Sequence, residues 1–436
     1  MDSYNVALYG CGTVGMGVAL TLLRPGPLHD RLSRPVRLRY VVDLRTEDIR
    51  RELQPPEHVI LTDDLERPLQ DPEVEGVIEL IGGTTHARRV IEQALQSGRD
   101  VATANKALLA ECGDELYALA RDNDASIAFE ASVGGGIPVI AALRNALVAD
   151  RVESVYGIVN GTCNYVLTRM LDRGIAYEDA LVEAQAKGYA EADPALDVEG
   201  TDSAHKLAVL ARLAFGVRVD LTDIPCEGIA EVELADLEYA RAQGYTLKLL
   251  AIGVRRDGAL ELRVHPALLH AAHPLSAVSG VYNAVCIHGD RAGEIVLTGK
   301  GAGRMPTSSA VVADIARMAL GTYQVDFAEL AQFGPVPDAT LVPFGDTETR
   351  YYLRLNCLDQ PGVLARVAGI LAKEGISIAS VRQHEVAARE QDFVPVVFMT
   401  HQAREADLRK ALRAINRLDV IQGPGPACCG SRTSDA

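Results

Sequence analysis

The sequence lacks an excess of positive charge. Its 43 lysines and arginines stand against 59 aspartates and glutamates, which gives a formal net charge of −16. Binding to phosphate backbones needs a positive footprint, and no lysine or arginine cluster offsets the acidic balance here. We therefore expect no nucleic-acid partner.

A long apolar run is also missing. An apolar stretch without charge lies between Glu130 and Arg144, contains three glycines, and falls short of the ~20 residues that a membrane span needs. The first residues, Met1 to Tyr4, lead straight into an apolar strand, with no basic segment or cleavage site before it. We expect a cytoplasmic protein with no membrane partner.

A C-x-x-C pair and an H-E-x-x-H group are absent as well. The eight cysteines are scattered, which in a long chain without export signals predicts reduced thiols rather than a disulfide framework. Among the ten histidines, His270 and His273 have H-x-x-H spacing, but no glutamate accompanies them, and we interpret all ten as structural or surface residues. The 436 residues are enough for two to four domains with apolar cores.

What the first ~130 residues do contain is an alternation of short β-rich runs and helical patterns, which is typical of a parallel sheet. The glycine-rich and Pro-rich segments between them read as turns and loops. The expected helices are Gly12–Leu23, Thr85–Gln96 and Leu108–Arg121. The expected strands are Tyr4–Tyr9, Val36–Asp43, Val74–Ile81, Val101–Ala104 and Ile127–Ala131.

From about residue 131 the pattern becomes α+β, with expected strands at Ala259–Val264 and Val281–His288. A Pro- and Gly-rich linker follows at Gln332–Asp346. The remainder has a β-α-β-β-α-β order, which is ferredoxin-like. We expect its strands at 351–357, Ile376–His384 and Phe393–Thr400, a helix at Glu405–Arg417, a last strand opening at Val420, and a frayed end from Cys428 to Ala436.

A phosphate-binding turn is indicated by Gly10, Gly12 and Gly15, which follow the first strand and open a helix. In a G-x-G-x-x-G turn the glycines allow the tight turn, the approach of the pyrophosphate, and close packing of helix on strand. The pyrophosphate then lies at the helix N-terminus, where free N–H groups attract it. The motif predicts a bound dinucleotide.

The choice between NAD and NADP stays open. Asp43 ends the second strand and could bind the ribose hydroxyls, although it lies farther along the chain than is usual. Arg45, Arg50 and Arg51 could instead accept a 2′-phosphate, or could form a solvated basic edge.

The richest polar segment runs from Gly188 to Lys206. Asp202, Lys206, Leu210 and Leu213 share one helical stripe whose far end is apolar, so Lys206 should point inward. A buried ammonium needs anionic partners, and Asp202, Asp197 and Glu191 could supply them. Such a lysine can give a proton to a carbonyl oxygen that receives a hydride. The alternative is a solvated acidic loop that caps a helix.

Lys106 is a second candidate, because it follows a strand at the carboxyl edge, where parallel sheets bind ligands. A cation at a helix start opposes the helix dipole unless an anion compensates it. A substrate carboxylate or oxyanion would do so. The alternative is an ordinary exposed lysine.

Six segments together resemble the homoserine dehydrogenase family, in that family's order over about the first 330 residues. They are Gly10–Gly15, Thr103–Ala107, Glu130–Pro138, Gly157–Asn164, Gly188–Lys206 and Gly301–Thr307. The resemblance implies NAD(P)-dependent interconversion of L-aspartate 4-semialdehyde and L-homoserine, in the biosynthesis of threonine, methionine and isoleucine.

The resemblance also implies residue roles. Lys206 is similar to the proton donor and Lys106 to a second lysine at the carbonyl, while Glu191, Asp197 and Asp202 match groups that hold the substrate's amino end and orient Lys206. Residues expected around the cofactor are Gly10, Gly12, Thr13, Val14, Gly15, Asp43, Arg45, Thr84, Lys106 and Gly303. Backbone carbonyls that match a sodium or potassium site are those of Glu130, Val133, Gly135 and Ile137.

One departure concerns the cofactor. Many members carry an arginine just before the acid that Asp43 matches, whereas Val42 stands there in this sequence. The resemblance therefore does not imply strict NADP use unless Arg45 substitutes.

The last ~80 residues resemble an ACT domain. Asp359, Gly362, Val363 and Leu364 match its strand-to-helix turn, where an amino acid can bind; in this family the effector is typically threonine. A purely dimerising module is the alternative. The expected assembly is a homodimer or homotetramer.

We therefore predict three domains. An α/β Rossmann-type NAD(P)-binding domain covers 1–132, with a return segment at about 300–322, and an α+β catalytic and dimerisation domain covers 133–331. A linker at 332–349 leads to a ferredoxin-like ACT regulatory domain at 350–425 and a tail at 426–436. Rival functions are a dehydrogenase for an imine or another semialdehyde, and an NAD-responsive regulator without catalysis.

Overall fold

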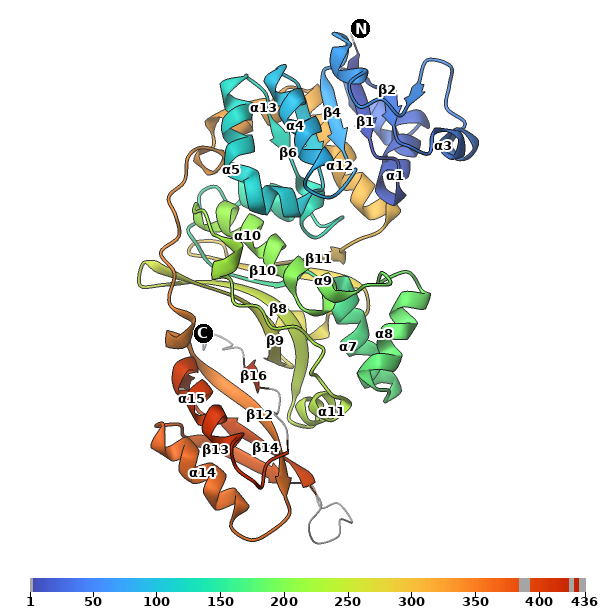
Figure 1. Ribbon diagram of the computed structural model, residues 1–436. Coiled ribbons are helices and arrows are strands. Elements are labelled where there is room, and N and C mark those ends of the chain that lie inside the picture. Colours follow the sequence, from blue (N-terminus) through green and yellow to red (C-terminus); the bar gives the residue numbers. More distant parts are fainter. Residues whose placement is uncertain (1–2, 384–392, 423–426, 431–436) are drawn as a thin grey trace. The chain divides into compact units, whose positions relative to one another are not determined.

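The computed structural model describes residues 3–383, 393–422 and 427–430. Contacts group the chain into two compact units (Figure 1). The first unit comprises Met1–Gly161, Asp202–Ile224 and Val281–Ala339, and the second comprises Thr162–Thr201, Pro225–Gly280 and Thr340–Ala436. Each unit is therefore assembled from segments that are far apart in the sequence.

The first unit contains a parallel six-stranded sheet in the order β3-β2-β1-β4-β5-β6. This is the strand order of a doubly wound dinucleotide-binding fold, and it confirms the expected Rossmann-type sheet. The strands are β1 (Tyr4–Tyr9), β2 (Val36–Val42), β3 (Ile60–Thr62), β4 (Gly76–Glu79), β5 (Asp100–Thr103) and β6 (Ile127–Ala128).

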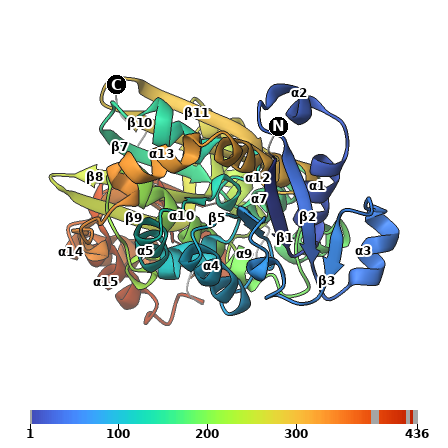
Figure 2. The ribbon, with the colours of Figure 1, turned by 90° about the horizontal axis from the view of Figure 1, so that it is seen from above.

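Helices pack on this sheet from both early and late parts of the chain. Helix α1 (Thr13–Leu23) and helix α12 (Arg304–Ala319), blue and orange in Figure 2, lie side by side. A Cβ at Gly17 would come within 2.7 Å of the Arg304 carbonyl oxygen, so only glycine permits this contact. Helix α12 also contacts β2, β4 and β5, while the return segment at about 300–322 stays a prediction. The first unit further contains α2 (Pro27–Arg31), α3 (Thr46–Leu53), α4 (His86–Gln96), α5 (Lys106–Asp122) and α13 (Thr322–Glu329).

Two helices of the first unit that the sequence did not predict, α2 and α3, are short and polar. Helix α2 buries none of its residues, and α3 buries only Ile49 and Leu53. Such segments carry too little apolar periodicity to stand out from a loop. By contrast β1 has the predicted bounds, because five of its six side chains are buried and form a continuous apolar run.

The first unit also contains an antiparallel group of strands in the order β11-β10-β7, namely β7 (Val152–Ile158), β10 (Tyr282–Gly289) and β11 (Gly293–Lys300). Short helix α6 (Val139–Ala141) precedes β7, and helix α10 (Thr201–Phe215) contributes residues from Asp202 onward. The expected strand at Val281–His288 is thereby confirmed as β10.

The second unit combines helices with a long antiparallel hairpin. The hairpin is β8 (Tyr245–Arg256) paired with β9 (Ala259–His270), so the strand expected at Ala259–Val264 is confirmed and is longer than predicted. Its helices are α7 (Gly161–Arg173), α8 (Tyr177–Ala186), α9 (Ala195–Val198) and α11 (Leu234–Ala242).

The C-terminal part of the second unit has strand order β16-β12-β14-β13, which is the 4-1-3-2 order of a ferredoxin-like fold. Its elements are β12 (Glu348–Leu358), α14 (Val363–Lys373), β13 (Ile378–Gln383), β14 (Phe393–Thr400), β15 (Ala403–Arg404), α15 (Glu405–Ile415) and β16 (Ala427–Gly430). His384, the predicted end of the second strand, lies outside the described residues.

Two predictions at the C-terminal end are wrong. Val420 does not open a strand; Ile421 forms only an isolated bridge with Cys357. Residues 427–430 belong to β16 rather than to a frayed end, since they pair with β12 and with β9. Without β16, the edges of β12 and β9 would present unpaired backbone N–H and C=O groups. A local sequence pattern does not show which strand edges lie beside a given segment in the folded chain.

Both faces of β12 are buried, although its sequence alternates. Tyr351 and Leu353 contribute to the apolar core of the C-terminal module, as predicted from the period of two. On the other face Tyr352 and Arg354 are also buried, and both bind the carboxylate of Asp236 on α11. The polar face of the strand is therefore an interface inside the second unit.

Among the residues that the structure describes, no helix has both the length and the apolar character needed to cross a membrane. The described cysteines Cys11, Cys112, Cys163, Cys226, Cys286 and Cys357 are free thiols.

Candidate active site

The carboxyl edge of the parallel sheet gathers most of the predicted site residues of the first unit. The glycine turn follows β1, Asp43 follows β2, and Thr84 lies beyond β4. Lys106 lies just after β5, as the first residue of α5. Because all six strands run in parallel, these segments leave the sheet at the same edge. Open parallel sheets bind their ligands at this edge.

The geometry of the glycine turn fits a bound pyrophosphate. Gly10 has φ +87°, and a Cβ there would lie 2.5 Å from the Leu80 carbonyl oxygen. A Cβ at Gly15 would lie 2.0 Å from the Gly10 carbonyl oxygen, so Gly15 permits the close contact of helix and turn. A Cβ at Gly12 would meet no atom within 4 Å, which leaves the backbone approachable where α1 begins at Thr13.

Asp43 links the second strand to the glycine turn. Its Oδ2 accepts a 2.8 Å hydrogen bond from the Cys11 amide, and its Oδ1 accepts one of 2.9 Å from the Arg45 amide. Burial opposes ionisation, but the hydrogen bonds from Arg45 and Cys11 lower the pKa of Asp43 below its usual value. An ionised carboxylate beside the turn is suited to accept hydrogen bonds from ribose hydroxyls.

Of the three nearby arginines, Arg45 is the one held at the turn. Its side chain is 58% exposed, contacts Asp43 at 3.2 Å and donates to the Cys11 carbonyl at 3.3 Å. Arg50 and Arg51 instead form ion pairs with Glu47 and Asp48 of their own helix. Arg45 is thus the arginine best placed to meet a 2′-phosphate.

Lys206 points inward, as its helical stripe predicted. Its side chain is only 12% exposed, and Leu210 and Leu213 further along α10 are buried. Its Nζ donates to Asp202 Oδ2 at 2.6 Å and to the Val159 carbonyl at 2.7 Å. An ammonium with two acceptors retains a third N–H for another oxygen.

Asp202 also holds Lys106, which comes from a distant part of the sequence. The Nζ of Lys106 lies 3.3 Å from Asp202 Oδ1, and its side chain is 38% exposed. No anion that could compensate Lys106 at the helix start was identified from the sequence, and the structure places Asp202 there. A substrate anion is therefore not required to explain this lysine.

The electrostatics of the cluster keep the carboxylate ionised. Burial raises the pKa of Asp202, but the charges of Lys206 and Lys106, together with hydrogen bonds from Lys206 and Asn160, lower it to about 2 from an ordinary 3.8. One anion thus faces two ammonium groups. The remaining positive charge suits a carbonyl oxygen on which negative charge develops.

Asn160 is a member of the cluster that the sequence did not single out. Its Nδ2 donates a 2.9 Å hydrogen bond to Asp202 Oδ2, the oxygen that also binds Lys206. The segment Gly157–Asn164 was recognised only as a motif. An asparagine and a backbone carbonyl, here that of Val159, leave no charge pattern from which this role could be inferred.

The structure gives the positions of four further predicted residues but does not test the roles predicted for them. Glu191 is exposed and Asp197 lies on α9, both in the second unit. Thr84 follows the loop beyond β4, and Gly303, with φ +121°, precedes α12. Their roles stay predictions.

The predicted cation segment is buried and turned by glycines. Residues 130–135 are buried, and Gly134 and Gly135 have φ of +73° and +55°. Both carboxylate oxygens of Glu130 accept backbone N–H groups, from Ile140 at 2.9 Å and Ala141 at 2.8 Å. The side chain is therefore committed to the chain, which fits ligation through backbone carbonyls rather than through the carboxylate.

The residues of the predicted effector turn lie where β12 leads into α14. Gly362 has φ +93° and caps α14, Val363 is buried in the core of the module, and Leu364 is exposed. The Oδ1 of Asp359 accepts a 3.1 Å hydrogen bond from Gln383. An amino acid bound through Asp359 would have to share or displace this contact.

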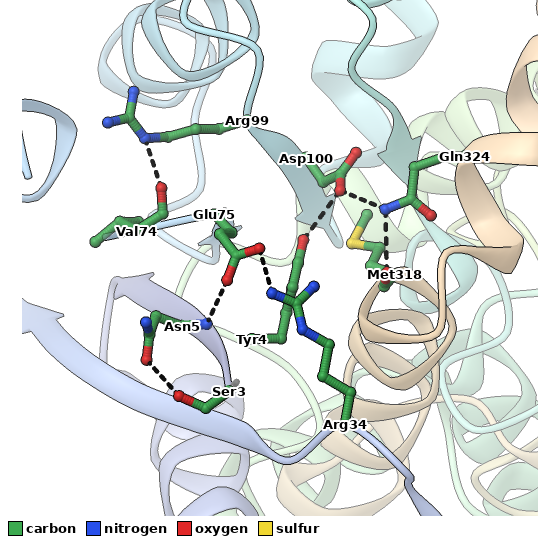
Figure 3. A network of polar contacts seen from close by, with 10 residues as sticks. All are labelled: Ser3, Tyr4, Asn5, Arg34, Val74, Glu75, Arg99, Asp100, Met318 and Gln324. Atoms are coloured by element: carbon green, nitrogen blue, oxygen red, sulfur yellow. Dashed lines mark hydrogen bonds and ion pairs between the residues drawn. The ribbon is translucent and has the colours of Figure 1, made fainter. Parts of the chain in front are cut away.

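A large hollow of about 700 Å³ lies at the opposite edge of the sheet, near the amino ends of the strands. Figure 3 shows the polar network that lines it, with Arg34 bound to Glu75 and with Tyr4 and Gln324 both bound to Asp100. These side chains satisfy one another across the starts of β1, β4 and β5. We interpret the hollow as structural, because the ligand-binding edge of a parallel sheet is the carboxyl edge.

Three family models match the chain. The homoserine dehydrogenase model matches residues 138–316, the NAD-binding domain model of homoserine dehydrogenase matches residues 10–130, and the ACT domain model matches residues 351–420.

Relatives match over almost the whole length. The chain is 39% identical to the homoserine dehydrogenase of Neisseria gonorrhoeae, over 97% of this chain and 98% of that protein. It is 42% identical to that of Mycobacterium bovis, over 96% of each. The crystal structure of a homoserine dehydrogenase from Thiobacillus denitrificans has a TM-score of 0.88 and 38% identity, and the match covers 99% of both chains. A hyperthermophilic archaeal homoserine dehydrogenase solved in complex with NADPH has a TM-score of 0.63 and 25% identity, over 73% of this chain and 98% of that one.

Proposed function

We propose, since the chain belongs to the homoserine dehydrogenase family, that Lys206 is the proton donor when L-aspartate 4-semialdehyde and L-homoserine are interconverted. The observation that carries this role is the buried position of its ammonium, 2.6 Å from Asp202 at the carboxyl edge of the sheet. A positioned ammonium can protonate a carbonyl oxygen as that oxygen gains charge.

Each residue of the cluster has a part in this mechanism. A bound NAD(P)H would supply the hydride that the carbonyl carbon receives. Lys206 donates its proton to the oxygen, and Lys106 stabilises the same oxygen by its charge. Asp202 orients both lysines, and Asn160 and the Val159 carbonyl fix the direction of Lys206. Glu191 and Asp197 hold the amino end of the substrate.

For the cofactor, the family and the glycine turn establish NAD(P), and the finer preference is part of the proposal. We propose that Asp43 binds the adenosine ribose and that Arg45 allows NADPH as well as NADH. Thr84, Lys106 and Gly303 are proposed to lie near the nicotinamide. A sodium or potassium ion is proposed at the carbonyls of Glu130, Val133, Gly135 and Ile137.

Regulation is proposed from the ACT domain, and assembly from the dimerisation domain expected at 133–331. Threonine would bind at the turn of Asp359, Gly362, Val363 and Leu364, and the chain would act as a homodimer or homotetramer. The domain boundaries at 132 and 331 and a cytoplasmic location stay predictions as well.

Steady-state assays of the purified protein test the proposal. Homoserine should be oxidised and aspartate and malate should not, and the assays should be run with NAD and NADP, with and without threonine. Lys206→Ala should lower turnover by ~10²–10⁴ while the protein stays folded. Lys410→Ala, at an exposed lysine of α15, is the matched control and should be as active as the parent. Near-normal turnover in Lys206→Ala contradicts the role of Lys206, and cofactor binding without turnover on any substrate favours a regulator.

A further inference from the structure

We infer that Glu79 is a positioning residue for the reaction: its buried carboxylate joins the loop that leads to Thr84 to the loop that presents Lys106. The inference rests on the proposed function, because it gives Glu79 a role only through those two residues. Glu79 is the last residue of β4, is 0% exposed, and touches neither lysine of the cluster in any contact that the structure records.

The first loop is held by one carboxylate oxygen. Oε1 of Glu79 accepts hydrogen bonds from the amides of Ile81 at 2.8 Å and Gly82 at 3.2 Å. Gly82 and Gly83 then have φ of +80° and +69°, a left-handed conformation that the loop must keep in order to turn toward Thr84. The carboxylate thus fixes the start of that turn.

The second loop is held by the other oxygen. Oε2 of Glu79 accepts a 2.7 Å hydrogen bond from the Thr103 hydroxyl, at the end of β5. The Thr103 hydroxyl in turn accepts one of 3.0 Å from the Asn105 amide. Asn105 Oδ1 accepts a 3.2 Å hydrogen bond from the Leu108 amide and so caps α5, whose first residue is Lys106.

The two loops are also joined directly. Asn105 Nδ2 donates a 2.7 Å hydrogen bond to the Gly83 carbonyl. A closed ring of hydrogen bonds therefore runs from Glu79 through Thr103, Asn105 and the loop of Gly82 and Gly83 back to Glu79. A ring of this kind sets the position of both loops at once.

Burying the charge of Glu79 costs free energy, and this cost argues against a role that is limited to forming a local turn. Burial raises the pKa of Glu79, and the hydrogen bonds from Thr103, Gly82 and Ile81 oppose that rise. Neutral residues can hold a turn without this cost. The carboxylate can accept at both oxygens simultaneously, and an ionised acceptor makes stronger hydrogen bonds.

The consequence for the site is positional. Lys106 begins α5 directly after Asn105, and its Nζ lies 3.3 Å from Asp202 Oδ1. A displacement of about 1 Å at a reacting group can cost ~10²-fold in rate. Loosening the ring would therefore move Lys106 and Thr84 without removing either of them.

The chain offers a matched control in Asp100. This carboxylate is also buried, at 8% exposure, and accepts hydrogen bonds from Tyr4, Gln324 and Ser126. Asp100, labelled in Figure 3, lies at the start of β5. Thr103 of the ring is the last residue of the same strand. A change at Asp100 disturbs the same sheet at its other edge.

The experiment compares Glu79→Ala, Glu79→Gln and Asp100→Asn in the full chain. We would measure the melting temperature, kcat, KM for homoserine and for the cofactor, and the Kd of NADPH from its fluorescence without substrate. Glu79→Ala should lower kcat by about 10- to 100-fold and weaken NADPH binding. Glu79→Gln keeps the shape and one acceptor, so its loss should be only about fivefold. Asp100→Asn should lower the melting temperature but leave kcat, KM and Kd at the parent values.

Native kinetic constants in folded Glu79→Ala would overturn the inference, and so would an equal kinetic loss in Asp100→Asn. If Glu79→Ala does not fold, Glu79→Gln decides, and parent-like constants in that variant overturn the inference. Lys106→Ala distinguishes a failure of the inference from a failure of the role proposed for Lys106. If Lys106→Ala is impaired and the Glu79 variants are not, only the inference fails. If Lys106→Ala is fully active, the proposed role of Lys106 fails, and the inference fails with it.

Discussion

Asp202 on α10 places its Oδ1 3.3 Å from the Nζ of Lys106, the first residue of α5. Its other oxygen binds Lys206 at 2.6 Å, so one carboxylate connects the two lysines that we propose at the reacting carbonyl. The same buried carboxylate therefore orients both lysines.

Replacing Asp202 with asparagine should lower turnover. The carboxylate orients both lysines, and a displacement of about 1 Å at a reacting group can cost ~10²-fold in rate. We expect kcat to fall about 10- to 100-fold in Asp202→Asn. Asn160→Ala, which removes one neutral donor to the same carboxylate, should lower kcat much less. Equal losses of kcat in the two variants would contradict the orienting role of the carboxylate.

The same carboxylate should contribute to stability in a defined pH range. Its pKa is about 2 in the folded chain and 3.8 ordinarily, so the unfolded state binds its proton first as the pH falls. The stabilisation is therefore fully present above about pH 4 and is lost as the pH falls toward 2, and it amounts to ~2 kcal/mol. Urea unfolding of the parent and of Asp202→Asn should give a constant difference from pH 7 to 5 and a shrinking one below pH 4. A difference that grows on acidification would refute this assignment.

Arg45 should decide how well NADPH is used. Its exposed guanidinium beside the glycine turn is placed to bind a 2′-phosphate, and a hydrogen bond between charged groups contributes ~1.5–3 kcal/mol. Arg45→Ala should raise KM for NADPH about tenfold or more and change KM for NADH little. Arg51→Ala, which removes an arginine paired with Asp48, serves as the control. Equal effects of Arg45→Ala on both cofactors would exclude a phosphate contact.

Asp236 should stabilise the attachment of the C-terminal module to the rest of the second unit. Its fully buried carboxylate accepts hydrogen bonds from Tyr352 at 2.6 Å and from Arg354 at 2.7 Å. Asp236→Ala leaves the buried guanidinium of Arg354 without this partner and should cost ~3–5 kcal/mol in the free energy of unfolding. Tyr352→Phe should cost only ~1 kcal/mol.

A surface ion pair of the same module provides the comparison. Arg366 and Asp419 lie 2.9 Å apart with both side chains exposed, so Asp419→Ala should change stability by less than ~1 kcal/mol. Urea unfolding of the three variants tests the ranking, and a loss in Asp236→Ala no larger than that in Asp419→Ala would show that the buried pair does not hold the module.

The parts of the fold that could be predicted from the sequence are those in which apolar residues form a continuous run or recur at regular spacing. β1 was found with its bounds because its buried side chains form an apolar run. The direction of Lys206 followed from a stripe that ends in Leu210 and Leu213. The order of the six strands agrees with what the glycine turn and the alternating pattern predict.

What the sequence did not predict depends on contacts between distant segments. The partnership of Lys106 with Asp202 joins two helices that no local pattern connects. Asn160 and Glu79 act through hydrogen bonds to side chains and backbone groups of other segments. The pairing of β16 with β9 likewise depends on an edge that only the folded chain presents.

The contact between Gly17 and Arg304 has a consequence for how the protein is made. During synthesis from the N-terminus the glycine turn and α1 emerge early, whereas α12, which covers α1, follows only after two of the three segments of the second unit have been translated. Until α12 is made, the apolar helix α1 stays uncovered. A chain that stops before residue 304 would lack the helix that packs against α1. Dinucleotide affinity should accordingly appear late, as one of the last properties that the growing polypeptide acquires.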